Sequence, residues 1–333
     1  MPAVRAVSLS ILPLLAALAA QAAPGAQDGA ASAPTPTALA VGAMQIASDA
    51  NLQVESVDVN VAADKIVYSY FLKNAGAVDL DLTASVVLPE LRASQDNEET
   101  WTLAGDDPEN PVALAVAADG APVATTAELR VAALGLDRLA EVKGAQLPLI
   151  PFGAAADKAL AGLAPETADR LAALGVVSPR DPADPRAAAT ADWALNVTRT
   201  WRQALPAGKM TSIGVTFAPI KAEYRLGKGD GDAIADAKDD LCLSAQTLAA
   251  LQARLASGGA LDAMEFAIDV SAPARWIDSP PATINVKKPK AESVVAFCGM
   301  DEKSAGNPIV IGALPDDASA TQLSVVVFTP AAK

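Results

Sequence analysis

The chain contains no histidine among its 333 residues. A Ser-His-Asp or Cys-His catalytic triad therefore cannot be assembled from this chain alone. The imidazole ligands that zinc, copper and non-haem iron commonly take are missing for the same reason. The functions that remain open use carboxylate, lysine or tyrosine chemistry, calcium binding through oxygen atoms, or binding without catalysis.

Aromatic and basic residues are also scarce. Aromatic residues make up 4% of the chain while all hydrophobic residues make up 51%, so we expect a core of small aliphatic side chains. The 25 basic residues are outnumbered by 39 acidic ones, which gives a formal net charge of −14. Nucleic-acid binding needs clustered Lys and Arg, and the one compact basic run is short: Lys287, Lys288 and Lys290. We therefore expect no nucleic-acid partner.

Beyond residues 1–22, no apolar run is long enough to predict a transmembrane helix. Residues 1–22 themselves predict a signal peptide, because Arg5 supplies a positive charge before an apolar run over 7–20. Ala20-Gln21-Ala22 is a small-x-small cleavage site. We expect cleavage after this site, a flexible Ala- and Pro-rich leader over 23–38, and a periplasmic or secreted protein.

Strict alternation of apolar and polar residues predicts strands early in the chain. It runs over Val57–Val61 and again over Val78–Leu88, so each strand is expected to have one buried face and one solvent-exposed face. Asp119-Gly120 predicts a hairpin turn between two further strands. Residues 39–127 are therefore expected to form a first β-sandwich unit.

The period of the pattern changes in the middle of the chain. Residues 128–188 predict a helical insertion and connector, with a helical stripe from Leu134 to Val142. Strand patterns return over 189–333, a second β unit that holds one long helix over Ala233–Ser257. Short turns and few βαβ alternations favour a mainly β fold of antiparallel β-sandwich units with α-helical insertions. Whether the two β units form one sandwich or two domains stays open.

Cys242 and Cys298 are the only cysteines. In an oxidising compartment they are expected to form a disulfide that ties the long helix to a late strand. The alternative is a catalytic thiol pair, which normally has CxxC spacing and a positive neighbourhood. Here Asp239 and Asp240 lie beside Cys242, so the disulfide is the better interpretation.

A first acidic cluster surrounds a tryptophan and is a candidate ligand-binding site. Its residues are Trp101, Glu98, Glu99 and Asp106. An exposed ring in such a loop could hold a sugar or a cation, whereas in the structural alternative it covers the end of the sandwich. Because paired carboxylates can cleave glycosides, a carboxylate-dependent hydrolase of envelope polysaccharide is an alternative function.

A second acidic cluster is a candidate calcium site, formed by Asp230, Asp232 and Asp236. Calcium prefers such oxygen ligands, but the spacing of an EF-hand loop is absent. Acidic residues also stabilise the start of a helix through its dipole. A calcium-stabilised structural protein is therefore a further alternative, and we expect no other cofactor.

Several blocks of the sequence resemble one protein family. In order along the chain they are Val54–Val59, Asp64–Asn74, Ala84–Pro89, Trp201–Lys209 and Ala296–Gly299. Together they resemble a family of exported proteobacterial proteins, domain of unknown function 4424. The resemblance implies export and assigns no activity and no catalytic residues. Because export, a disulfide and a sandwich scaffold are predicted and no convincing catalytic set is found in the sequence, we expect a non-catalytic binding or envelope-interaction module whose partner is an envelope protein or a glycan.

Overall fold

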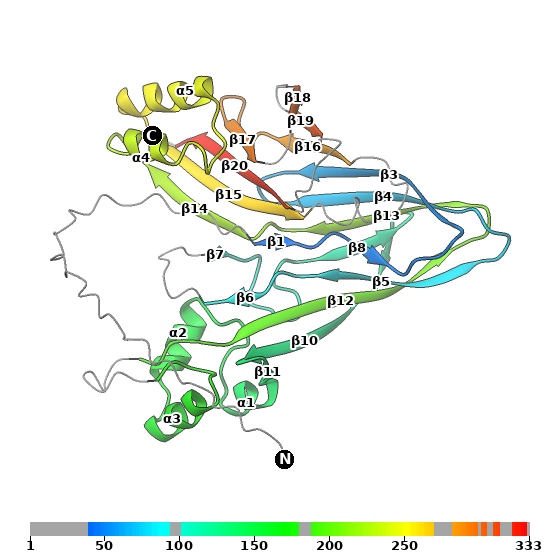
Figure 1. Ribbon diagram of the computed structural model, residues 1–333, viewed down its shortest axis with the longest axis horizontal. Helices are drawn as coiled ribbons and strands as arrows, with labels where there is room; N and C mark the ends of the chain where they lie inside the picture. Colours follow the sequence, from blue (N-terminus) through cyan, green and yellow to red (C-terminus); the bar gives the residue numbers. More distant parts are fainter. Residues whose placement is uncertain are drawn as a thin grey trace, which may run out of the picture. The chain divides into compact units, whose positions relative to one another are not determined.

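The computed structural model describes residues 39–93, 101–179, 188–269, 282–298, 301–304, 309–313 and 322–331 (Figure 1). The predicted signal peptide and leader lie outside the described residues, as do Glu98 and Glu99. The described part is mainly β, with antiparallel sheets and few helices, which confirms the predicted fold class.

The strands form three sheets. The first sheet has the order β17 (Val294–Cys298), β20 (Gln322–Pro330), β15 (Leu261–Asp269), β14 (Lys221–Leu226) and β7 (Trp101–Thr102), with β1 (Ala40–Val41) beside β15. The second has the order β11 (Leu136–Asp137), β10 (Thr126–Ala133), β12 (Ala194–Leu205), β5 (Leu80–Val87) and β2 (Gln45–Ile46), with β6 (Leu91–Arg92) beside β12. The third has the order β18 (Asp301–Ser304), β19 (Ile309–Ala313), β16 (Thr283–Lys287), β3 (Leu52–Val61), β4 (Ile66–Asn74), β13 (Met210–Phe217), β8 (Ala115–Ala118) and β9 (Ala121–Val123).

Early and late strands pair directly in every sheet. β7 pairs with β14 in the first sheet, β5 with β12 in the second, and β4 with β13 in the third. Among the described strands, the pairs β1–β15 and β3–β16 are parallel and the others are antiparallel. Backbone ladders therefore connect the segment before residue 128 to the segment after residue 189.

The main core is the hydrophobic cluster shared by all three sheets. It includes Phe266 and Val325 from the first sheet, Leu195 from the second, and Tyr68 and Ile213 from the third. β4 shows why the sequence pattern predicted it, since buried and half-buried side chains alternate along the whole strand.

A smaller core, called here the helix-side core, lies on the opposite face of the first sheet. Leu226 and Phe328 from this sheet pack there with Ile234 of α4 (Gly231–Asp236) and with Leu251 and Leu255 of α5 (Ala245–Ala256). The first sheet is therefore covered on both faces over much of its area, by the other sheets on one side and by two helices on the other (Figure 1).

The helix predicted over Ala233–Ser257 is in fact two helices. α4 ends at Asp236, and α5 begins after Ser244, whose hydroxyl oxygen accepts a hydrogen bond from the Thr247 amide at 3.0 Å. Cys242 lies between them with a φ of 50°. A helix cannot continue through a left-handed residue, and the spacing of apolar residues does not report this conformation.

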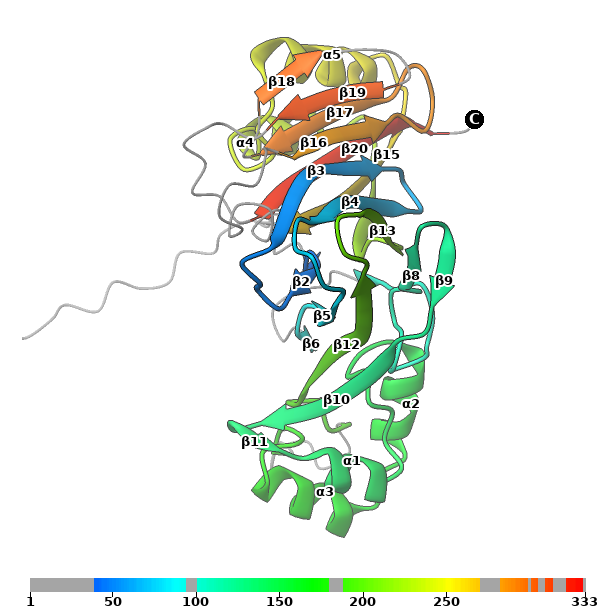
Figure 2. The same ribbon diagram turned by 90° about the vertical axis from the view of Figure 1, so that its right-hand side faces the viewer.

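The helical stripe predicted from Leu134 to Val142 also starts later than expected. β10 continues to Ala133, and Leu134 and Gly135, with φ of 49° and 77°, turn the chain into β11. Only then does α1 (Leu139–Gly144) begin, followed by α2 (Ala154–Ala161) and α3 (Pro165–Ala173). Figure 2 shows these three helices grouped beside β10 and β11. Such turns usually carry Asn-Gly or Asp-Gly, so Leu-Gly gave no turn signal.

Two tyrosines from β4 are fully buried in the main core. The Tyr68 hydroxyl donates a hydrogen bond to the Asp269 carbonyl oxygen at 2.9 Å, and the Tyr70 hydroxyl accepts one from the Met44 amide at 2.9 Å. The ring of Tyr68 stacks on Tyr70 and on Phe217, with centroids 6.0 and 5.8 Å apart. Burial raises the pKa of both hydroxyls well above the usual tyrosine value.

Candidate functional site

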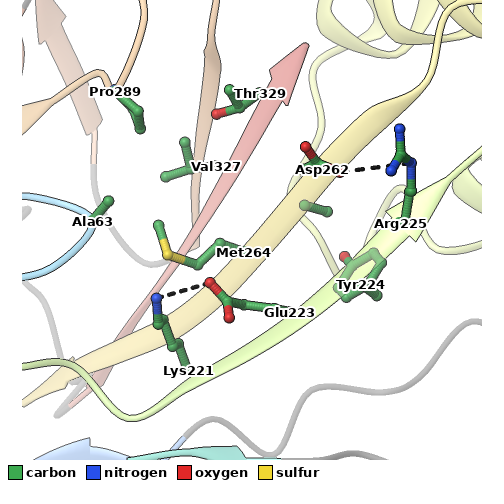
Figure 3. Close-up of a pocket in the computed structure, with 11 residues that line it drawn as sticks. Ala63, Lys221, Glu223, Tyr224, Arg225, Asp262, Met264, Pro289, Val327 and Thr329 are labelled. Atoms are coloured by element: carbon green, nitrogen blue, oxygen red, sulfur yellow. Dashed lines mark ion pairs between the residues drawn. The ribbon is translucent and has the colours of Figure 1, made fainter. Parts of the chain in front are cut away.

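A pocket of about 510 Å³ lies on the first sheet (Figure 3). Strands β14, β15 and β20 form its floor, and Ala63 and Pro289, from the turns after β3 and after β16, also line it. It opens on the sheet face that carries the main core. The opposite face of the same strands is the one that packs on α4 and α5.

The pocket is found where the apolar face of the first sheet becomes polar. Deep in the sheet, Phe266 is opposite Val325, and both belong to the main core. Two residues along β15, Met264 is opposite Val327, with exposed fractions of 8% and 3%. Because alternate residues of a strand share one face, these pairs form successive rows. In the second row Met264 and Val327 supply the apolar part of the pocket floor, and Glu223 of β14 lies beside Met264.

The next row outward is polar and charged. Asp262 is opposite Arg225 on β14 and opposite Thr329 on β20. All three side chains line the pocket. Thr329 is held at the rim by a hydrogen bond of 3.1 Å between its hydroxyl and that of Ser293. From one row to the next, the side chains on β15 and β20 thus change from Met264 and Val327 to Asp262 and Thr329, and Arg225 of β14 lies opposite Asp262.

Four charged side chains line the pocket as two ion pairs, which differ in the separation of their charged atoms and in the exposure of their side chains. Lys221 Nζ lies 2.8 Å from Glu223 Oε1, and the lysine side chain is only 23% exposed. Arg225 Nε lies 3.8 Å from Asp262 Oδ1, and these side chains are 63% and 56% exposed. The second separation is too long for a hydrogen bond. Within the part of the chain that the structure describes, Arg225 and Asp262 therefore have each other as ionic partners but no hydrogen bond.

The acidic cluster predicted around Trp101 does not line this pocket. Trp101 lies in β7, pairs with Ala222 of β14, and packs half-buried against the main core. Asp106 is exposed in the loop that follows β7. Trp101 is nevertheless close in the sheet to the pocket wall, because Ala222 lies between Lys221 and Glu223.

The three predicted calcium ligands lie around α4. Asp230 precedes the helix and its Oδ2 accepts a hydrogen bond from the Gly227 amide at 2.6 Å, while Asp232 and Asp236 lie within α4. In the described segments, no group of three Asp, Glu, Cys or His side chains comes together in a way that could hold a metal ion. The hydrogen bond of Asp230 instead closes the turn before the helix.

The predicted disulfide between Cys242 and Cys298 is confirmed. The two Cα atoms lie 5.3 Å apart and the residues are 56 positions apart in the sequence. The bond joins the loop between α4 and α5 to the last residue of β17, so it fastens the helix layer to the first sheet.

The charged residues of the pocket were not predicted as a site. A signal was present, because Lys221, Glu223 and Arg225 alternate with less polar residues over six positions, as in a strand with one wet face. This segment is only six residues long, and no strand was assigned to it from the sequence. The pairing with Asp262 could not be seen at all, because it depends on which strand lies alongside.

The fold and the pocket together define a mainly β protein with a ligand-sized site on one sheet. The chain belongs to the family described as domain of unknown function (DUF4424), whose family model matches residues 34–312. This confirms the resemblance noted in the sequence.

Comparisons with individual proteins add little to this family assignment. No curated protein matches the chain. Among solved structures, the chain is similar to a protein from Legionella pneumophila that is provisionally named a nutrient binding protein, with a TM-score of 0.39 and 9% identity over 88% of this chain and 71% of that chain. None of the helices in the described residues is long and apolar enough to cross a membrane.

Proposed function

We propose that the chain is a non-catalytic binding module that works outside the cytosol, as a periplasmic or secreted protein, and that it binds a small ligand in the pocket on the first sheet. The observation that carries the proposal is the pocket itself. Its volume of about 510 Å³ falls in the range of small-molecule sites.

The lining of the pocket suits recognition. Small-molecule sites usually combine an apolar surface with a few placed polar groups that fix the orientation of the ligand. Met264 and Val327 supply the apolar surface, and the ion pairs Lys221–Glu223 and Arg225–Asp262 supply the polar groups. These groups stand on neighbouring strands of a sheet that is packed on both faces, so they are held by rigid backbone.

The disulfide supports the proposed compartment. Disulfides persist in the periplasm and outside the cell, whereas cytosolic thiols are kept reduced. The bond between Cys242 and Cys298 is therefore in keeping with the export signal that the sequence predicts over residues 1–22.

One arrangement in the pocket favours a second function, a carboxylate-dependent hydrolase of envelope polysaccharide. Glu223 and Asp262 are diagonal neighbours on β14 and β15, and both line the pocket. Glycoside hydrolysis uses two carboxyl groups on either side of the scissile bond. Here each carboxylate faces a cation of the chain, so binding remains the better proposal.

The test measures binding and turnover on the same preparation. The full chain is exported to the periplasm of a bacterial host and purified, and its melting temperature is followed against amino acids, dicarboxylates, sugars and quaternary amines. We expect a saturable rise with at least one class, and none of that rise in an Arg225→Ala/Asp262→Ala variant. Chromogenic glycosides are assayed in parallel. Enzyme-like turnover that Glu223→Gln or Asp262→Asn abolishes would overturn the proposal in favour of the hydrolase.

A further inference from the structure

We propose that the pocket selects a ligand that carries a positive and a negative group close together beside an apolar substituent, that is, a zwitterion of the α-amino-acid type with an apolar side chain. This inference deepens the proposed function and rests on it.

Arg225 and Asp262 have unused capacity for hydrogen bonds. Arginine offers five N–H donors in a planar fork, and an ionised carboxylate offers about four acceptor positions. In the described residues these two side chains make one loose contact at 3.8 Å and no hydrogen bond. A ligand carboxylate can therefore take the bidentate geometry that a guanidinium favours, and a ligand ammonium can donate to Asp262, without separating the pair.

The arrangement of the two charges matches that of an α-amino acid. Arg225 and Asp262 are directly opposite on antiparallel strands, so their charged ends stand side by side at one rim of the pocket. In an α-amino acid the ammonium nitrogen and the carboxylate carbon are bonded to the same carbon atom. A ligand laid across the pair thus places each of its charges against the opposite charge of the protein.

The apolar substituent has a surface to lie on. Met264 and Val327 are one row inward from Asp262, which corresponds to about 7 Å along a strand. The side chain of a bound amino acid can reach over this distance while its charged groups remain at Arg225 and Asp262. Methionine is unbranched and polarisable, so Met264 can adjust to aliphatic groups of different shape.

The ion pair Lys221–Glu223 restricts the net charge of the ligand that the pocket can accept. Lys221 Nζ and Glu223 Oε1 form a close ion pair at 2.8 Å, and the Lys221 side chain is only 23% exposed. The four side chains carry two positive and two negative charges, so their charges cancel. A ligand with only a negative charge would face Glu223 and Asp262, and one with only a positive charge would face Lys221 and Arg225. Among charged ligands, one that carries both charges can place each of them against an opposite charge of the pocket.

The experiment is a calorimetric titration of the full exported chain with four probes: L-leucine, N-acetyl-L-leucine, L-leucinamide and glycine. L-leucine has both charges and an apolar side chain, and each of the others lacks one feature. We expect L-leucine to bind, and each of the other probes to bind at least tenfold more weakly.

Two pocket variants and one matched control test whether Arg225 and Asp262 contact the bound L-leucine. Arg225→Gln and Asp262→Asn are expected to weaken L-leucine binding at least tenfold, and Arg225→Gln should barely change the weak binding of L-leucinamide, which has no carboxylate. The control is Arg202→Gln, because the Arg202–Asp81 pair at 2.7 Å is similarly exposed but lies on β12 and β5 of the second sheet. This variant should bind L-leucine like the wild type, and thermal melts establish that all variants are folded.

The outcomes separate the inference from the proposed function. If N-acetyl-L-leucine, a dicarboxylate or a sugar binds in place of L-leucine and the pocket variants abolish that binding, the function stands and the zwitterion inference is overturned. Equal affinity for L-leucine in wild type, Arg225→Gln and Asp262→Asn would overturn it as well, because the ligand would then lie elsewhere. Absence of binding for every probe, including the wider panel, overturns both.

Discussion

The hydroxyl of Tyr70 accepts a hydrogen bond from the backbone amide of Met44, 2.9 Å away and inside the main core. It joins the segment between β1 and β2 to the centre of the third sheet. Met44 is itself fully buried. The phenol oxygen therefore supplies the partner that a buried backbone N–H requires.

Replacing this tyrosine tests how much the contact stabilises the fold. Tyr70→Phe keeps the ring but leaves the Met44 amide without its acceptor, which costs about 1–3 kcal/mol of unfolding free energy. Urea denaturation at neutral pH measures the loss. A change below about 0.5 kcal/mol, the range of ordinary surface substitutions, would show that this amide finds another partner.

Stability should also fall at alkaline pH. Burial raises the pKa of Tyr68 and Tyr70, so the folded chain holds these protons after the unfolded chain has lost them. The unfolded hydroxyls titrate near pH 10, and from there upward the unfolding free energy decreases with rising pH. Denaturation curves from pH 7 to 11 measure the slope. The Tyr68→Phe/Tyr70→Phe variant should show a clearly shallower alkaline decline, and an identical slope would contradict the assignment.

The disulfide should contribute a large share of the stability. For cysteines 56 positions apart, the chain-entropy relation gives about 4 kcal/mol. Cys242→Ser/Cys298→Ser should therefore lower the melting temperature markedly and loosen the helix layer first, since the bond joins the α4–α5 loop to β17. Hydrogen exchange resolves the order of opening. Uniform loss of protection across all three sheets would contradict this localisation.

Leu134 is a position where a substitution should increase stability. It has a φ of 49°, which is unfavourable for a branched side chain, and it is 79% exposed. Its side chain also lies over Gly175, where an added Cβ would come within 2.4 Å of Leu134 Cδ1. Leu134→Asn suits the turn and should raise the unfolding free energy by about 0.5–1 kcal/mol after losing that contact.

The matched control for this substitution is Leu136→Asn, because Leu136 is also largely exposed, at 55%, but lies in β11. Denaturation curves of the two variants are compared with the wild type. The control should show no gain. If Leu134→Asn is the more destabilising of the two, packing on Gly175 outweighs the backbone strain.

Much of the sheet structure could be predicted because burial leaves a direct trace in the sequence. The alternation of Val57, Val59 and Val61 follows from the two faces of β3, and all three side chains are buried. The disulfide could be predicted from two cysteines and an export signal. Each of these predictions can be made without knowing which strands lie side by side in the fold.

The pocket and the helix break could not be predicted for the opposite reason. Arg225 and Thr329 meet Asp262 only because β14 and β20 flank β15. No periodicity encodes that neighbourhood. Likewise, the helical spacing of Leu241 and Ala245 continues across Cys242, and the left-handed backbone of Cys242 becomes apparent only with the fold. The alternation of charged residues along β14 is visible in the sequence, but the strands that lie beside it, and therefore the site, are not.

Native mass spectrometry of the chain recovered from its native compartment determines whether the pocket on the first sheet holds a small ligand there. We expect the wild-type chain to carry a small bound molecule that is released on unfolding, the Arg225→Gln/Asp262→Asn variant to lack it, and the Arg202→Gln control to retain it. A wild-type chain with no bound mass, or the same bound mass in the pocket variant, would show that the pocket is not a binding site.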